Sequence, residues 1–207
     1  MEFLYKDEHI VVCIKPSGLL SAKDASGKAN MPSVIAEELG IKEVYPVHRL
    51  DKEVSGVMVF ALTSKAAAKL SADVSDHSKF VKEYLALVGG TPKEAEGVFE
   101  DLLFKDSSKN KTFVVKKERR GVKKAKLEYK TVDVINGKAL VRVKLHTGRT
   151  HQIRVQFSSR GMPIVGDRKY GGENCDNGIM LFSVKLSFAH PITNEKLSFD
   201  YVPELLK

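Results

Sequence analysis

Cysteine is scarce in this chain of 207 residues, which contains only Cys13 and Cys175. Two thiols can build neither a disulfide framework nor a zinc site with four thiolate ligands, so a reducing compartment is the simplest expectation. The chain also lacks an apolar run of membrane-spanning length, and its N-terminus does not have the pattern of a signal peptide. We therefore expect a cytoplasmic protein.

Motifs that cradle phosphates are missing as well. The glycines near the C-terminus, Gly166 and the pair Gly171 and Gly172, lack the spacing of a P-loop or of a dinucleotide fingerprint. No serine lies in a nucleophile elbow. These absences argue against dependence on ATP or a nicotinamide and against a serine hydrolase.

Positive charge is in excess, with 34 Lys and Arg against 26 Asp and Glu and a net charge of +8. This excess favours an anionic partner, with nucleic acid the leading candidate. Residues 109–130 hold ten Lys or Arg and two Glu. Two interpretations stay open for this segment: a solvated hairpin edge on which lysines prevent aggregation, or an arm that contacts phosphates.

The hydrophobic pattern predicts a mixed, largely antiparallel α+β fold, because predicted strands outnumber helices and short turns join most of them. Asn136 and Gly137 lie between two alternating segments and predict a type I′ hairpin turn. A length of 207 residues fits one large domain or two joined lobes. The predicted helices are 31–39 and 64–74, and the predicted strands are 10–14, 57–61, 80–88, 127–134, 139–145 and 180–188.

Two polar motifs carry the candidate chemistry. In residues 48–56 (HRLDKEVSG), Asp51 lies between basic residues just before an apolar strand. It is a lone carboxylate apart from Glu53, which suits a nucleophile or a base rather than a pair of acids. An arginine from the second motif, residues 147–154 (TGRTHQIR), could keep it ionised, and Arg149 and Arg154 are the candidates. The alternative is that Asp51 caps a turn or forms a structural ion pair.

Two histidines, His48 and His151, raise the question of a metal site. Each has an arginine nearby in its motif, which repels a cation, and the chain has no compact set of ligand residues. We therefore expect no metal. These histidines are expected to form hydrogen bonds within the loops or to contact substrate.

The first motif closely resembles the catalytic motif of the RluA-type pseudouridine synthases, enzymes that isomerise uridine in ribosomal and transfer RNA. Further matches occur in the family's order and span most of the chain. They are residues 15–18 (KPSG), 82–84 (KEY), 147–154, and 163–167 (PIVGD) with 170–171 (YG). The resemblance implies a single catalytic domain over residues 1–207, with a central sheet, flanking helices and a catalytic cleft. It implies RNA as the partner and no cofactor.

The resemblance also implies roles for matching residues. Asp51 is expected to drive cleavage of the N1 glycosidic bond, either by attacking the sugar or by removing its 2′ proton. Tyr84 is expected to stack on the flipped base and Arg154 to pair with Asp51, which makes these three the catalytic set. Flipping is needed because C1′ and the ring faces are blocked inside a helix. The residues expected to contact substrate are His48, Arg49, Leu50, Arg149, His151, Gln152 and Leu181.

The chain departs from the family pattern at two places. Val54 stands where threonine is usual, and Phe182 and Ser183 stand where His-Ala is common. Neither departure touches the expected charged pair, so we expect activity to survive, while support of the aspartate loop stays an open question. The motifs begin almost at residue 1, so we also expect the S4-like N-terminal domain of many relatives to be missing and recognition to rest on the catalytic domain.

Two other functions remain as alternatives. A non-catalytic RNA-binding module would need only the basic surface and Tyr84, and it would tolerate Asp51→Asn. A hydrolase using Asp51 and His48 would act on small nucleotides without RNA. The sequence does not distinguish ribosomal from transfer RNA as the substrate, and a monomer is the default expectation.

Overall fold

The computed structural model describes residues 1–204. The chain divides into two compact units, and each is described by itself. Unit 1 combines Met1–Lys82 with the segment that starts at Phe182, and unit 2 is Glu83–Leu181. In the described part of the chain, no helix has the length and apolar character needed to cross a membrane.

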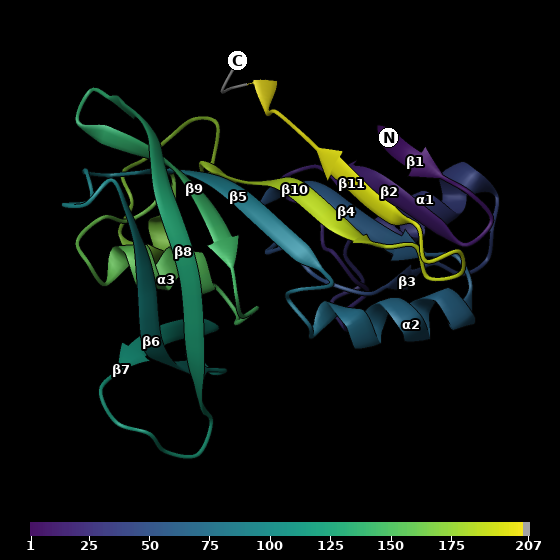
Figure 1. Cartoon of the computed structure of the whole chain (residues 1–207), viewed down its shortest axis with the longest axis horizontal. Coiled ribbons are helices and arrows are strands. Elements are labelled where there is room, and N and C mark those ends of the chain that lie inside the picture. Colours follow the sequence, from purple (N-terminus) through teal and green to yellow (C-terminus); the bar gives the residue numbers. More distant parts are fainter. Residues whose placement is uncertain (205–207) are drawn as a thin grey trace. The chain divides into compact units, whose positions relative to one another are not determined.

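Unit 1 is built from strands and two helices (Figure 1). The strands are β1 (Phe3–Lys6), β2 (Ile10–Lys15), β3 (Tyr45–Pro46), β4 (Ser55–Ala61), β10 (Leu181–Ala189) and β11 (Lys196–Asp200), and the helices are α1 (Met31–Leu39) and α2 (Ser64–Val74). Strand β2 pairs antiparallel with β1 and β4, β3 pairs antiparallel with β4, and β11 does so with β10. Strands β4 and β10 pair in parallel.

Local sequence explains both helices of unit 1. The Asn30 side chain accepts a hydrogen bond from the Ser33 amide at the start of α1, and Gly40 ends the helix at φ 66°. Thr63 caps α2 by accepting from the Ala66 amide. Both predicted helices are therefore confirmed. Helix α2 contributes to a core of apolar side chains from β2, β4 and β10, whose members include Ile10, Val12, Val57, Val59, Ala66, Leu70, Phe80, Leu186 and Phe188.

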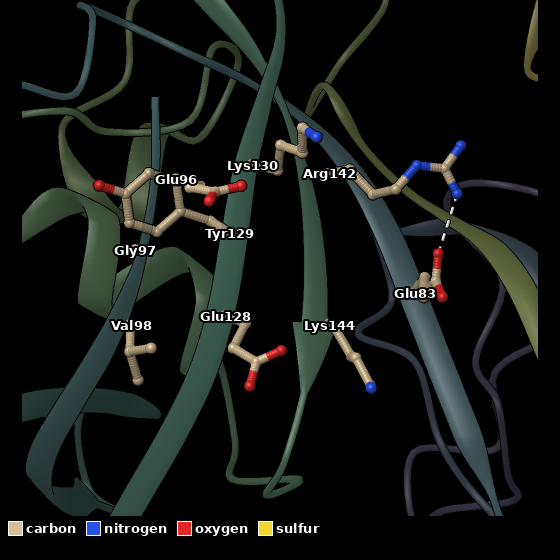
Figure 2. A pocket seen from close by; sticks show the side chains of 9 residues that line it. All are labelled: Glu83, Glu96, Gly97, Val98, Glu128, Tyr129, Lys130, Arg142 and Lys144. Atoms are coloured by element: carbon tan, nitrogen blue, oxygen red, sulfur yellow. Dashed lines mark hydrogen bonds and ion pairs between the residues drawn. The ribbon is translucent and has the colours of Figure 1, made fainter. Parts of the chain in front are cut away.

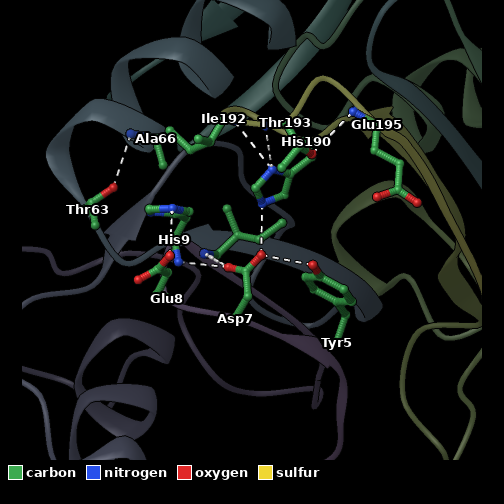
Figure 3. Close-up of polar contacts among 11 residues, drawn as sticks. Tyr5, Asp7, Glu8, His9, Thr63, Ala66, His190, Ile192, Thr193 and Glu195 are labelled. Atoms are coloured by element: carbon green, nitrogen blue, oxygen red, sulfur yellow. Dashed lines mark hydrogen bonds and ion pairs between the residues drawn. The ribbon is translucent and has the colours of Figure 1, made fainter.

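A network of polar contacts stabilises the turn between β1 and β2 of unit 1 (Figure 3). Asp7 accepts hydrogen bonds from the Tyr5 hydroxyl at 2.8 Å and from the His9 and Ile10 amides at 2.7 and 2.8 Å. His190 Nε2 lies 2.9 Å from the same carboxylate, while its Nδ1 accepts from the Thr193 amide at 3.1 Å. The backbone donors and Tyr5 hold the pKa of Asp7 below its usual range although partial burial acts to raise it. These groups join two turns of the fold.

Unit 2 contains five strands and one α-helix. They are β5 (Val81–Val88), β6 (Glu96–Asp106), β7 (Lys111–Val115), β8 (Val122–Ile135), β9 (Lys138–Leu145) and α3 (Gln152–Ser158), followed by the 3-10 turn η1 (Arg168–Tyr170). The strand order is β5-β9-β8-β6-β7, and each neighbouring pair is antiparallel. Asn136 and Gly137 have φ values of 51° and 75°, which confirms the predicted hairpin turn.

Helix α3 covers one face of the unit 2 strands through an aromatic cluster. The Phe157 ring lies 5.0 Å from the Phe99 ring and 5.8 Å from the Tyr129 ring. Strand β6 and helix α3 were not predicted from the sequence. The antiparallel pairing within both units, with the parallel β4 and β10 in unit 1, confirms the predicted mixed, largely antiparallel α+β class.

Gly56 permits the close approach of β4 and β10. Its φ is 121°, and a Cβ atom at this position would lie 2.1 Å from the carbonyl oxygen of Ser183. Because this neighbour is backbone, it cannot move away without breaking the pairing. The glycine of the first sequence motif is therefore required by the sheet.

We expect Gly56→Ala to lower the free energy of unfolding by about 3 kcal/mol or more, since it combines backbone strain with an overlap. Gly137→Ala is the matched control: its φ is 75° but the space around it is open, so a loss of about 1–2 kcal/mol is expected. Urea denaturation followed by circular dichroism measures both. Equal losses of unfolding free energy in the two variants would show that the backbone at Ser183 shifts to make room for the added Cβ atom.

Candidate active site

Asp51 lies in an irregular loop between β3 and β4 of unit 1. Its side chain is half-buried, and the Val54 amide donates to its backbone carbonyl at 3.1 Å. The loop has no regular hydrogen-bond ladder of its own, so its shape must be imposed by other parts of the chain.

The turn after β2 imposes that shape by binding the loop's backbone carbonyl groups. Lys15 Nζ donates to the carbonyl of Lys52 at 2.9 Å, and the Gly18 amide donates to the same oxygen at 2.9 Å. The Ser17 hydroxyl donates to the carbonyl of Glu53 at 2.7 Å. We call residues 15–21 the loop clamp.

Ser21 completes the loop clamp by pairing twice with Leu50. Its hydroxyl donates to the Leu50 carbonyl at 2.8 Å and lies 3.0 Å from the Leu50 amide, from which it accepts. Both groups are buried. The two backbone groups next to Asp51 are therefore satisfied by one side chain that lies 29 residues earlier in the sequence.

Lys15 brings a positive charge to the clamp. The residue is completely buried, and its ammonium also donates to the Pro16 carbonyl at 2.8 Å. Burial lowers the pKa of Lys15 to about 8, and the carboxylates of Glu53 and Asp51 counteract that shift. The cation thus lies close enough to the carboxylates of Glu53 and Asp51, on the loop that it holds, for their charges to act on it. Sequence analysis matched Lys15 to a family motif but gave it no role.

His48 lies in the interior of unit 1. Its Nε2 accepts a hydrogen bond from the Val59 amide at 3.1 Å, and its ring meets the Phe80 ring edge-on at 5.3 Å. Burial lowers the pKa of His48 to about 3, so the ring is neutral at physiological pH. Of the two roles left open above, this position favours support of the loop. Leu50 is also buried, whereas Arg49 is exposed.

The departures from the family pattern have structural counterparts. Val54 is 2% exposed and packs as an apolar residue. Ser183 is 1% exposed, and its hydroxyl donates to the Val57 carbonyl on β4 at 3.1 Å. Ser183 therefore adds a side-chain bond to the pairing that Gly56 permits.

In unit 2, Arg154 forms a buried, bidentate ion pair with Asp167. Nε lies 2.7 Å from Oδ2 and Nη2 lies 2.8 Å from Oδ1. The Asp167 side chain is completely buried and that of Arg154 is 6% exposed. The guanidinium also lies 5.2 Å from the centre of the Tyr170 ring. Two parallel hydrogen bonds of this kind fix the orientation of the guanidinium plane as well as the position of its charge.

His151 meets the same tyrosine. The residue has a φ of 53°, and its Nδ1 lies 2.9 Å from the Tyr170 hydroxyl, which accepts from the Thr112 amide at 2.8 Å. Burial raises the pKa of Tyr170. Tyr170 and Asp167 matched the family only as parts of a motif, and no local signal in the sequence reveals their contacts with α3.

Gln152 orders the turn that carries Arg149. Its Oε1 accepts from the Thr147 hydroxyl at 2.7 Å and from the Arg149 amide at 3.1 Å, while Nε2 donates to the Lys126 carbonyl at 3.1 Å. Gln152 is 3% exposed, so its visible role is to hold the turn. Arg149 is exposed, and its Nε donates to the Lys124 carbonyl at 3.0 Å.

Tyr84 and Leu181 complete the predicted set. Tyr84 lies opposite Val143 in the ladder of β5 and β9 and is 6% exposed, and Leu181 at the start of β10 is 3% exposed. The structure thus groups His48, Arg49, Leu50 and Asp51 on one segment of unit 1. It groups Arg149, His151, Gln152 and Arg154 around the start of α3 in unit 2.

The open face of the unit 2 sheet carries a hollow of about 620 Å³ (Figure 2). Its charges alternate across the strands, with Glu83, Glu96 and Glu128 beside Lys130, Arg142 and Lys144, and Arg142 donates to Glu83 at 2.9 Å. A balanced surface of this kind does not attract a polyanion. Within residues 1–204, no cluster of three or more His, Cys, Asp and Glu side chains could hold a metal ion.

Comparison with known proteins identifies the class. Residues 9–159 match the family described as RNA pseudouridylate synthase. The chain is 36% identical to the dual-specificity RNA pseudouridine synthase RluA of Salmonella typhimurium, over 95% of this chain and 90% of the relative. It is 31% identical to ribosomal large subunit pseudouridine synthase D of Zymomonas mobilis, over 97% of this chain and 68% of the relative.

A solved structure agrees in fold. The human RNA pseudouridylate synthase domain containing 4 superimposes with a TM-score of 0.80 at 24% identity, covering 99% of this chain and 90% of that one. The chain belongs to the RNA pseudouridylate synthase family. It is thus an isomerase that acts on RNA, and the predicted family and reaction class are confirmed.

We expect Asp167→Ala to lower the free energy of unfolding by about 3–5 kcal/mol, because it leaves the buried Arg154 guanidinium without its bidentate partner. Glu100→Ala is the control, since it breaks the exposed pair with Lys126 and should cost less than about 1 kcal/mol. Urea denaturation of both variants tests this. Similar small losses in the two would mean that the Arg154–Asp167 pair adds little to stability.

Proposed function

We propose that this protein converts uridine to pseudouridine in ribosomal or transfer RNA. The relatives support both substrates: one is named for the ribosomal large subunit, and another, tRNA pseudouridine synthase C of Vibrio parahaemolyticus, is 32% identical. The observation that carries the proposal is the loop clamp, which holds the backbone on both sides of Asp51 and brings the Lys15 cation within electrostatic reach of it.

The proposed reaction is an isomerisation in which Asp51 acts on the target nucleotide. The carboxylate either attacks C1′ of the ribose or removes the 2′ proton, and the bond between N1 and C1′ breaks. The detached uracil turns and C5 bonds to C1′, while the ester bond between C1′ and Asp51 breaks in the first route or the 2′ proton returns from Asp51 to the sugar in the second. The proton on C5 then leaves and N1 gains one, which restores the Asp51 carboxylate and leaves an isomer of uridine. Apart from protons exchanged with water, no group is transferred to another molecule and no electrons are gained or lost, so no cofactor is proposed. We further propose that Arg154 is the cationic partner of Asp51 and that Asp167 orients its guanidinium.

Access to C1′ requires the uridine to leave the RNA stack. We propose that Tyr84 stacks on the flipped base and that Leu181 packs against it. Arg49 is exposed, as a residue must be if it fills the vacated place in the RNA. Arg149, His151, Gln152, Leu50 and His48 complete the proposed substrate-binding set, of which Gln152 and His48 act by holding loops.

The segment 109–130 supplies a basic surface in unit 2. Lys116, Lys117, Arg119 and Arg120 are exposed. The Arg119 guanidinium lies 4.5 Å from the centre of the Phe104 ring, and Phe113 is 36% exposed beside Lys111. Cations interleaved with aromatic rings suit phosphates and unstacked bases. We propose that this segment is an RNA-contacting arm rather than only a solvated edge.

Other expectations remain proposals. We propose that the two units act together as one catalytic domain, that the protein works as a monomer, and that it is cytoplasmic. The free thiols of Cys13 and Cys175 are compatible with a reducing compartment.

Release of tritium from RNA that carries 5-tritiated uridine tests the function, since that label leaves when C5 becomes the glycosidic carbon. We expect Asp51→Asn to reduce release by at least about 1,000-fold, as removal of a catalytic group does, while RNA binding persists. Glu53→Gln, which alters an exposed carboxylate two residues away, should retain activity. Ribosomal and transfer RNA transcripts are assayed side by side.

The outcomes also separate the alternatives. A wild-type protein that binds both RNAs but releases no tritium from either would indicate the non-catalytic binding module. Turnover of small nucleotides without RNA would indicate the hydrolase. Equal tritium release by wild type and Asp51→Asn would disprove the assigned role of Asp51.

The arm is tested by salt dependence. We expect the double variant Lys116→Ala and Lys117→Ala to flatten the slope of log affinity against log salt by about 0.7–0.9 for each phosphate that the arm no longer binds. The control removes two exposed lysines of unit 1, Lys42 and Lys65, and should leave the slope unchanged. Filter binding over a series of salt concentrations measures both. An unchanged slope in the arm variant would leave the segment as a solvated hairpin edge.

A further inference from the structure

Lys82, the first residue of the KEY motif, is a buried lysine without a carboxylate partner. It is 6% exposed, and its Nζ lies 5.4 Å from the centre of the Phe80 ring. Within residues 1–204, its ammonium makes no hydrogen bond and no ion pair. A buried cation that is not paired opposes folding, so its presence needs an explanation other than stability.

The charge of Lys82 persists at neutral pH. Burial lowers its pKa to about 8, and no carboxylate among the described residues counteracts the shift. The group is therefore mostly protonated at pH 7. This contrasts with Lys15, whose ammonium is satisfied by two carbonyl groups and lies near two carboxylates.

A second donor belongs to a residue that also contacts the Phe80 ring, His48. His48 Nε2 accepts from the Val59 amide, so the proton of the neutral ring is on Nδ1, which is buried and has no partner in the described part of the chain. Lys82 and His48 both contact the Phe80 ring, and the Lys82 charge helps to keep His48 neutral. This part of unit 1 therefore has an excess of donors over acceptors.

Lys82 is not completely buried, because 6% of the residue stays exposed. His48 Nδ1, in contrast, is fully buried. In sequence, His48 lies three residues before Asp51. Lys82 lies two residues before Tyr84 on β5, so strand alternation directs both side chains to the same side.

We propose that Lys82 binds a phosphate group of the RNA nucleotide that enters the site. The proposal rests on the proposed function, because the ligand is the substrate RNA. A phosphate carries the permanent negative charge and the oxygen acceptors that the ammonium lacks in the free protein. The RNA then supplies the counter-charge that a structural lysine would already have.

Stability provides the first test, since a structural role and a binding role predict opposite results. Lys82→Met keeps the aliphatic length and removes the charge, so its urea midpoint at pH 7 should equal or exceed that of the wild type. The folded-state pKa of Lys82 lies below its ordinary value of 10.5, so the unfolded chain binds more protons between about pH 8 and 10.5. Wild-type stability should therefore rise relative to Lys82→Met across that window. A lower midpoint for Lys82→Met at pH 7 would overturn the proposal.

Affinity for RNA provides the second test. We expect Lys82→Met to bind the RNA transcript about 10- to 100-fold more weakly than wild type, the range for removal of a charged hydrogen bond. Lys65→Met, which removes an exposed lysine of α2, should bind as wild type does. Equal affinity of Lys82→Met and wild type would overturn the proposal, as would a lower rate at saturating RNA with unchanged affinity.

The pH profile identifies the ammonium itself. Wild-type affinity should fall as the pH rises above about 8, while Lys82→Arg, which stays charged, should show a smaller fall over the same range. Among the described residues, the titratable group on which the Lys82 charge is seen to act is His48, which is neutral throughout this range because burial lowers its pKa to about 3. Lys15 also has a pKa of about 8, but it is present in every variant. Parallel profiles for wild type and Lys82→Arg would overturn the proposal.

Neutralising single phosphates locates the contact. RNAs that carry one methylphosphonate on either side of the target uridine are compared in a double-mutant cycle with Lys82→Met. One replacement should weaken binding to wild type and leave binding to Lys82→Met unchanged. If all replacements weaken both proteins equally, the proposal is wrong. Its failure is distinct from that of the function: tritium release with no Lys82 effect overturns only the phosphate contact, and a Lys82 effect without tritium release overturns only the isomerisation.

Discussion

The position of Asp51 depends on backbone carbonyl groups that its own loop cannot satisfy. Lys15, Ser17 and Ser21 bind the carbonyls of residues 52, 53 and 50, so the loop clamp fixes the segment through atoms that any sequence would present. An ammonium suits this task because it offers three donors, and two of them are used on carbonyl groups. Unlike a hydroxyl, the ammonium also adds a positive charge that interacts with the carboxylates of Glu53 and Asp51.

In unit 2, the position of Arg154 depends on a carboxylate rather than on backbone carbonyl groups. The Asp167 carboxylate accepts parallel hydrogen bonds from Nε and Nη2 of Arg154, and the Tyr170 ring lies against the same guanidinium. Because both side chains are buried, the orientation exists before any substrate arrives. A preorganised charge needs no rearrangement during the reaction, which is the main way in which an enzyme makes electrostatic stabilisation effective.

Elements with strong local signals were predictable from the sequence. The helices at 31–39 and 64–74 have caps at Asn30 and Thr63, and the hairpin has its Asn136–Gly137 turn. Helix α3 was missed because it is seven residues long and buries polar side chains whose partners are distant in sequence, as for Gln156 with Asp101. The candidate site shows the same division. Motifs located Asp51 and Arg154, but the burial of Lys15, His48 and Asp167 arises from tertiary packing, which no local pattern encodes.

The effect of the net charge of +8 on binding depends on where the charges lie. On the open sheet face, acidic and basic side chains alternate and largely cancel, whereas the arm carries an excess that acts over about a Debye length in solution. An excess of that kind attracts any RNA, because phosphates are the same in every sequence. The role proposed for the buried Lys82 differs, since it would bind a nucleotide only after that nucleotide has left its stack. On these proposals the arm attracts RNA and Lys82 places the target nucleotide, so discrimination among uridines would come mainly from how easily each leaves its helix and from the groups that then surround it.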